Sequence, residues 1–179
     1  MGSFLQIILD HLKELWPLRV VDPDCQGVRF DRGLPAGRLD PGVHWFVPFL
    51  QRVEEHAVTY QEIDCQLQTV ETSDGHSVTF SANLGYTVRD AAKARTEVHD
   101  LDTTLERATR GALGGLVAAR TWDAVRSQSR DLGDEARRAV ADLASGWGIK
   151  IVRVRLTDFT RSKPYRLFTG QANSGLPIF

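Results

Sequence analysis

A run of alternating side chains between His76 and Arg89 constrains the fold more than any other part of the chain. From Val78 to Val88 every second residue is apolar, and the residues between them are hydroxyl, amide or glycine positions. A period of two predicts a β-strand with one face buried and one face in solvent. The apolar face of such a strand has to be covered, so the strand also predicts a half-covered antiparallel sheet beneath an amphipathic element.

The dipeptide Asp74-Gly75 just before this strand is a strong signal for a tight hairpin turn. We predict a two-residue loop that pairs Ser73 with His76, because the apolar residues of the two strands then fall opposite each other. The expected ladder pairs Glu71 with Val78, Thr69 with Phe80, Leu67 with Ala82, Cys65 with Leu84 and Ile63 with Tyr86. A shift by one residue would place Gln66 and Gln68 opposite the apolar face instead.

Short strands separated by proline and glycine precede the hairpin, and helices follow it. Strands are expected at 18–22, 26–31, 43–47, 52–60 and 61–72, with a turn-rich connection at 32–37. Helices are expected at 90–98, 101–120 and 123–146, followed by a strand at 149–157 and a helical turn at 161–168. Gly111, Gly114 and Gly115 lie inside the second helix, which indicates close approach to a sheet or another helix. The predicted fold class is α+β, a strongly bent antiparallel sheet covered by helices.

Residues 4–16 predict an amphipathic N-terminal helix that ends at Pro17. Its apolar stripe is the candidate surface for a membrane or partner contact: Phe4, Leu5, Ile8, Leu9, Leu12, Leu15 and Trp16. The polar face has no excess of lysine and arginine, which interface-binding helices usually carry, so charge alone favours docking on protein. We divide the chain into this helix at 1–17, a domain at 18–168 and a tail at 169–179.

Composition argues against several classes of function. A net charge of −1 gives no general attraction to nucleic acid, and no run approaches the ~18 apolar residues that a membrane-spanning helix needs. The two cysteines, Cys25 and Cys65, lie far apart, so we expect reduced thiols in a cytoplasmic protein. The histidines are scattered, and we find no motif for a metal, a cofactor or a catalytic nucleophile.

Basic residues in the C-terminal half are open to two interpretations. They could form a phosphate-binding face, but interleaved acidic residues favour a salt-bridged face, either solvated or between subunits. The residues concerned are Arg107, Arg110, Arg126, Arg130, Arg137, Arg138, Arg153, Arg155, Arg161, Lys163 and Arg166. The four tryptophans are interpreted as core or interface anchors.

Three groups of residues follow one another in an order that resembles that of a known protein family. The first is Gly27-Val28-Arg29, Gly33, Pro41-Gly42-Val43-His44 and Val47-Pro48-Phe49. The second is Thr72-Ser73-Asp74-Gly75, Val78 and Tyr86-Thr87-Val88-Arg89-Asp90, and the third is Trp147-Gly148-Ile149, Val152, Val154 and Asp158. Together, over about residues 20–168, they resemble the stomatin/prohibitin/flotillin family, also called SPFH or band 7.

The resemblance implies a membrane-associated scaffold that builds large rings or cages from laterally packed domains and is not usually catalytic. We therefore expect a non-enzymatic homo-oligomer without cofactor, metal or nucleic acid, which organises a membrane patch or client proteins. Its N-terminal helix is the candidate peripheral membrane contact. Two alternatives stay open: a monomeric adaptor that binds protein or peptide on a strand edge, and an enzyme with an unrecognised histidine or carboxylate site.

Overall fold

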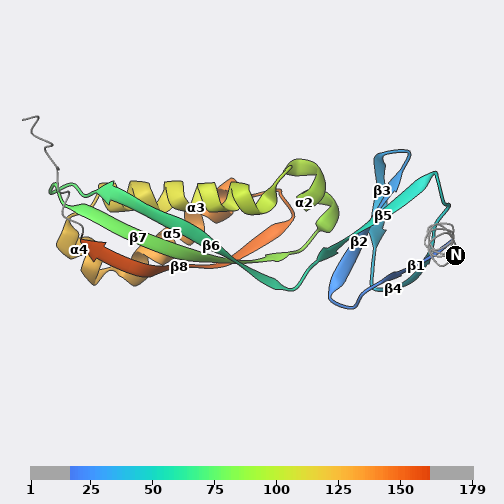
Figure 1. The fold of residues 1–179 in the computed structure, drawn as a ribbon, viewed down its shortest axis with the longest axis horizontal. Coiled ribbons are helices and arrows are strands. Elements are labelled where there is room, and N and C mark those ends of the chain that lie inside the picture. Colours follow the sequence, from blue (N-terminus) through green and yellow to red (C-terminus); the bar gives the residue numbers. More distant parts are fainter. Residues whose placement is uncertain (1–16, 162–179) are drawn as a thin grey trace, which may run out of the picture.

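The structure is a computed structural model that describes residues 17–161. It is elongated, with a small lobe of short strands at one end and a larger, helix-covered lobe at the other (Figure 1). The small lobe contains β1 (Leu18–Val21), β2 (Cys25–Asp31), β3 (Leu34–Leu39), β4 (Gly42–Trp45) and β5 (Gln51–Ala57). The larger lobe contains β6 (Tyr60–Glu71), β7 (Ser77–Val88), α2 (Ala91–Glu97), α3 (Leu101–Ala118), α4 (Trp122–Ser127), α5 (Ser129–Leu143) and β8 (Ile149–Arg161).

The strands form three antiparallel sheets, in the orders β1-β4, β3-β2-β5 and β6-β7-β8. The α+β class and the antiparallel pairing are thus confirmed. The expected single bent sheet is divided, however, because the proline and glycine corners of the first half leave strands of only four to seven residues there. The predicted N-terminal helix and most of the predicted helical turn at 161–168 lie outside the described residues, while Arg161 itself ends β8.

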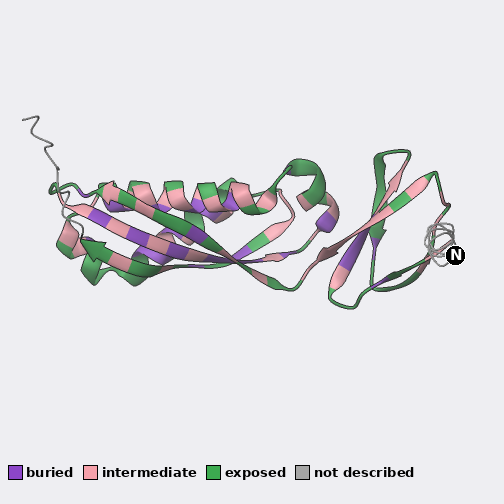
Figure 2. Ribbon diagram, in the orientation of Figure 1, coloured by how far each residue is buried: buried purple, intermediate pink, exposed green. Residues whose placement is uncertain are grey.

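Strand β7 lies at the centre of the larger lobe and carries its core. Its alternate residues from Val78 to Val88 are all buried, as the sequence predicts, with Phe80 and Leu84 among the largest fully buried side chains. Helices α3 and α5 lie side by side over this face, and their buried residues include Leu105, Leu113, Leu132 and Val140 (Figures 1 and 2). The opposite face of β7 is less exposed to solvent than expected, since the ring of Tyr60 covers Gly85.

The predicted hairpin register is wrong. Glu71 pairs with Ser77, so the loop is longer than the two-residue turn at Asp74-Gly75. The reason is that the turn residues also hold the junction of α3 and α4. The Asp74 carboxylate accepts hydrogen bonds from the Thr72 hydroxyl at 2.6 Å and from the Trp122 N–H at 3.1 Å, and the Ser73 N–H donates to the Arg120 carbonyl at 2.9 Å.

A β-bulge between Cys65 and Gln68 then shifts the register once more. It returns Cys65 and Ile63 to positions opposite Ala82 and Leu84, so the core face stays apolar beyond the bulge. Gln68 does lie opposite Phe80, contrary to our prediction. Its amide is satisfied there, because it donates to the Arg110 carbonyl of α3 at 3.0 Å.

Three further differences concern the other elements. The connection expected at 32–37 contains most of β3, an edge strand on which Pro35 needs no hydrogen-bond donor. The helix expected at 123–146 is interrupted at Gln128, where the Ser127 hydroxyl bonds back to the Asp123 carbonyl. Of the glycines in α3, only Gly114 lies against the sheet, whereas Gly111 and Gly115 face open space.

Candidate functional site

One end of the small lobe presents an exposed apolar surface, which we define as Val20, Val43, Trp45, Val47, Phe49 and Leu50. Val20 on β1 lies directly opposite Val43 on β4, and Trp45 lies opposite Leu18. Residues opposite each other in an antiparallel pair share a face, so Val20, Val43 and Trp45 lie together. Trp45 is 73% exposed and Val43 is 64% exposed. Such a cluster on a free chain indicates a contact surface for a partner or a membrane.

The loop that follows β4 carries a further exposed apolar side chain, Phe49. Its side chain is 91% exposed, and its backbone has a φ of 70°. A bulky side chain rarely adopts this left-handed conformation. Burying a phenylalanine side chain contributes about 1.5–3 kcal/mol, so both the exposure and the strained backbone of Phe49 reduce the stability of the chain when nothing covers it. Residues held in this way are found preferentially where a ligand or partner binds.

The candidate contact residues predicted from the sequence, Phe4 to Trp16, all lie outside the described residues, and that prediction remains untested. They precede Pro17, whose carbonyl accepts a hydrogen bond from the Phe46 N–H at 3.0 Å. Pro17, which follows the predicted stripe in the sequence, is thus hydrogen-bonded to the residue after β4. Of the two roles that the sequence left open for Trp45, core or interface anchor, its 73% exposure excludes the first. No signal in the sequence indicates that Val20 and Val43 lie beside it.

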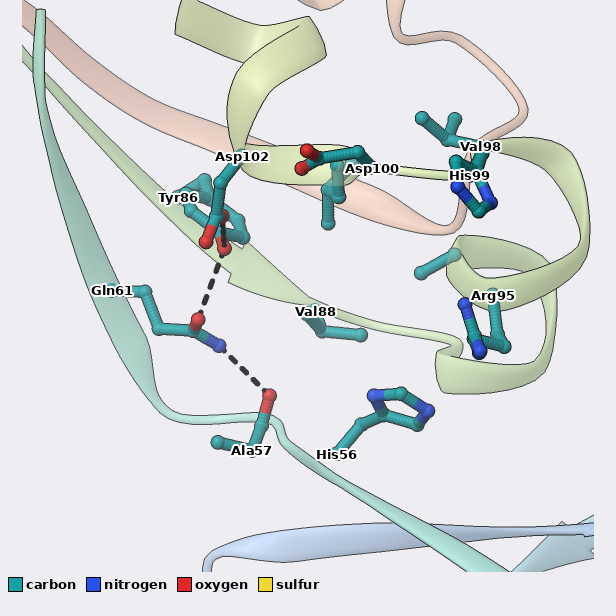
Figure 3. Close-up of a pocket in the computed structure, with 12 residues that line it drawn as sticks. His56, Ala57, Gln61, Tyr86, Val88, Arg95, Val98, His99, Asp100 and Asp102 are labelled. Atoms are coloured by element: carbon teal, nitrogen blue, oxygen red, sulfur yellow. Dashed lines mark hydrogen bonds between the residues drawn. The ribbon is translucent and has the colours of Figure 1, made fainter.

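A second candidate is a pocket at the junction of the two lobes, with a volume of about 410 Å³ (Figure 3). Tyr86, Asp102 and Gln61 lie on one side of it, and His56, Arg95 and His99 lie on the other. The Tyr86 hydroxyl is within hydrogen-bonding distance of Asp102 Oδ1 at 2.6 Å and of Gln61 Oε1 at 3.0 Å. Gln61 in turn donates to the Ala57 carbonyl at 2.9 Å. These bonds tie β6, β7 and the first turn of α3 together.

The polar groups of the junction pocket favour a structural role over catalysis. Burial and the hydrogen bond to Asp102 raise the pKa of Tyr86, so its hydroxyl stays protonated as a donor. Asp100 accepts from the Thr103 N–H as the N-cap of α3. Burial lowers the pKa of His56, and the nearest carboxylate oxygen to its Nε2 is that of Glu54 at 4.0 Å. No histidine–carboxylate hydrogen bond is found in the described pocket, so the arrangement that orients a histidine base in a catalytic triad is not seen there.

Of the nine residues in this basic set that the structure describes, three are paired with acidic side chains. Arg153 bonds to Glu62 on the open face of the large sheet, and Arg110 and Arg137 have acidic partners on their own helices at 3.8 and 3.9 Å. The salt-bridged face is thus the better interpretation for these three residues. Within residues 17–161, no three His, Cys, Asp or Glu side chains are placed to hold a metal ion.

Both cysteines are free thiols, as predicted. Cys65 is buried beneath α3, and its burial, reinforced by the negative charge of Glu106, raises its pKa to about 11. Burial also raises the pKa of Cys25. Because the thiolate is the reactive form, neither residue is poised as a nucleophile.

Comparisons with known proteins agree with the motifs. The model of the SPFH domain / Band 7 family matches residues 19–166. An uncharacterized protein of Archaeoglobus fulgidus is 30% identical over 160 residues, which is 88% of this chain and 62% of that protein. A stomatin homologue of Pyrococcus horikoshii is 23% identical, over 79% of this chain and 53% of its own length. Mouse stomatin is 20% identical, over 88% of this chain and 56% of its own length.

The chain spans about half to three fifths of the length of these relatives. Among the described residues, no helix combines the length and the apolar composition that crossing a bilayer requires. The matched region extends from the second residue of β1 to beyond the end of β8, so it includes both lobes and the hairpin that carries the core. On this evidence the chain belongs to the SPFH domain / Band 7 family.

Proposed function

We propose that this chain is a non-enzymatic scaffold that assembles by lateral packing of its domains and rests on a membrane through its small lobe. The observation that carries the proposal is the exposed apolar surface. Val20, Val43 and Trp45 share one face of two paired strands, and further exposed apolar side chains follow in the next loop, which supports a contact surface at this lobe.

Family membership supports a role in assembly, and relatives named stomatin are among the matches. The long strands of the larger lobe offer a means of lateral contact. Both β6 and β8 are edge strands in their three-stranded sheet, and β8 is thirteen residues long. Part of the β6 edge is occupied, because the Gln66 N–H donates to Glu106 of α3. The β8 edge is also approached in part, by α5 at the Val154 carbonyl, so the residues of either edge outside these contacts are the candidates for pairing with a neighbour.

Particle mass and vesicle binding test the two parts of the proposal separately. Sedimentation velocity over a dilution series should show species larger than one chain. Flotation with phosphatidylcholine vesicles should carry the protein upward, and a Val43→Ser/Trp45→Ser variant should float less. Leu143→Ser is the matched control, since Leu143 is 57% exposed but lies on α5, away from the apolar surface.

Deleting residues 1–17 asks whether the predicted N-terminal helix contributes to the same contact. A chain that stays monomeric at every concentration would remove the scaffold and favour the adaptor that binds protein on a strand edge. Flotation that is unchanged by the Val43→Ser/Trp45→Ser variant would show that the apolar surface is not the membrane contact.

A further inference from the structure

A pocket in the small lobe combines arginines with apolar side chains, and the family assignment does not account for it. We define the arginine pocket by Arg32, Phe49, Leu50, Arg52, Glu54 and Arg95. Its volume of about 590 Å³ is within the usual range for small-molecule sites. It is built from three separate segments, namely the turn between β2 and β3, the β4–β5 loop with the start of β5, and α2. The Arg32 N–H donates to the Leu50 carbonyl at 2.9 Å and so joins the first two segments.

The charges in the arginine pocket do not balance. Glu54 is largely buried and bridges two of the arginines, with one oxygen 3.1 Å from Arg52 and the other 3.1 Å from Arg95. The third arginine, Arg32, makes no ion pair with any described residue. The lining of the pocket therefore has one carboxylate and three guanidinium groups, two of which pair with that carboxylate. The pocket has an excess of positive charge and preorganised donors, the arrangement that guanidinium groups use to bind phosphate.

Backbone strain is concentrated at the same pocket. Between residues 17 and 161, Arg32 and Phe49 are the only residues other than glycine with a positive φ, at 50° and 70°. Arg32 and Gly33 form a two-residue hairpin turn, which accounts for the positive φ but would favour asparagine or aspartate at the first position. Both strained residues line the arginine pocket. The strained backbone thus positions Arg32, which has no ion-pair partner among the described residues, and the exposed ring of Phe49 at the same pocket.

We propose that the arginine pocket binds the phosphate group of an anionic phospholipid, with Phe49 against the apolar part of the same lipid. This inference rests on the proposed membrane contact. A free phosphate ion would use the arginines but leave Phe49 without a role. Phe49 lines the arginine pocket and is 91% exposed, so a bilayer that covers Phe49 would bring lipid phosphates to the pocket.

Flotation of the whole chain tests the proposal with two kinds of vesicle, phosphatidylcholine alone and phosphatidylcholine mixed with phosphatidylglycerol. Binding should be stronger on the anionic vesicles. Arg32→Asn should lose roughly ten-fold in binding to them, since it removes charge-assisted hydrogen bonds while its side chain suits the turn. Arg32→Lys should lose most of the extra binding to anionic vesicles, because an ammonium group keeps the charge but lacks the planar pair of N–H donors of a guanidinium group.

Arg38→Asn is the matched control. Arg38 lies on β3 in the same lobe, is paired with Asp40 at 3.3 Å and does not line the pocket, so we expect its loss to change binding by no more than about two-fold. Equal losses for Arg32→Asn and Arg38→Asn would indicate a general electrostatic attraction and overturn the pocket. Circular dichroism spectra and melting curves establish that each variant is folded.

The other outcomes separate this inference from the proposed function. Equal binding to neutral and anionic vesicles would overturn the pocket but leave the membrane contact standing. Failure to bind neutral vesicles would contradict the membrane contact through the apolar surface. Extra binding to anionic vesicles that depends on Arg32 would still support the arginine pocket. Glycerol 3-phosphate that binds without vesicles as tightly as the vesicles do would identify a soluble ester as the ligand and overturn the lipid assignment.

Discussion

The packing of α5 on β8 predicts a large effect from the smallest substitution, Gly133→Ala. A Cβ atom at this position would lie 2.5 Å from the backbone oxygen of Val154. Neither group can swing aside, because both belong to main chain within a helix and a strand. Contacts to carbon are optimal near 3.5 Å, so helix and strand would have to separate by roughly 1 Å. Alanine also gains about 1 kcal/mol over glycine in helix propensity, which offsets part of the loss.

Overpacking of this kind typically destabilises a protein by about 1–3 kcal/mol, and we expect a net loss in that range for Gly133→Ala. Gly115→Ala is the matched control, because a Cβ on Gly115 of α3 meets nothing within 4 Å. It should gain about 1 kcal/mol from helix propensity alone. Urea denaturation of dilute protein, followed by far-ultraviolet circular dichroism, measures both. If Gly133→Ala were as stable as the parent while Gly115→Ala gained stability, the close contact between α5 and β8 would be refuted.

Three further predictions address other parts of the larger lobe. In a Cys25→Ser background, Cys65 should react with iodoacetamide at about pH 8 roughly two hundred times more slowly in the folded protein than in urea. The reason is that its raised pKa of about 11 leaves little thiolate in the folded protein. Comparable rates in the two conditions would mean that the folded protein leaves the thiol accessible. Hydrogen bonds from Thr72 and Trp122 lower the pKa of Asp74, so its contribution to stability is present above the unfolded value of about 3.9 and is lost as the pH falls through the lower folded value. Asp74→Asn should therefore be less stable than the parent at neutral pH, and the two urea midpoints should converge in acid; a constant difference would contradict the linkage. Gly148 has a φ of 72° and a Cβ there would lie 2.5 Å from the Asp90 carbonyl oxygen, whereas Gly146, at 96°, faces open space. Gly146→Ala should lose about 1–2 kcal/mol from backbone strain, and Gly148→Ala should lose more in the same thermal or urea unfolding experiment.

The parts of the fold that the sequence predicts are those governed by local pattern. The alternation from Val78 to Val88 correctly identifies the buried face of β7, and Asp90 caps α2 as its position suggests. The hairpin register was not predictable from that pattern. It depends on hydrogen bonds between Asp74 and Trp122 and between Ser73 and Arg120, residues far along the chain, and on a bulge that restores the alternation.

The candidate surfaces were harder to predict for a similar reason. Trp45 is as apolar in sequence as a core residue, and only the pairing of β1 with β4 shows that nothing within residues 17–161 covers it. The arginine pocket draws on residues from 30 to 95, and neither the spacing of Arg32 and Arg95 nor their type marks them as neighbours. The positive φ of Phe49 has no sequence signal either, because glycine or asparagine would be expected there.

Strands β6 and β7 are each twelve residues long and run from the junction of the lobes to the hairpin beside α4. At about 3.3 Å per residue, each spans roughly 40 Å. If the small lobe rests on a bilayer with this axis upright, the larger lobe, with α3 and α5 packed along these strands, would rise above it to a height set by hydrogen-bonded strands and not by a flexible tether. Copies packed side by side would then have the same height above the bilayer. A membrane protein beside them would face a continuous protein surface of uniform height.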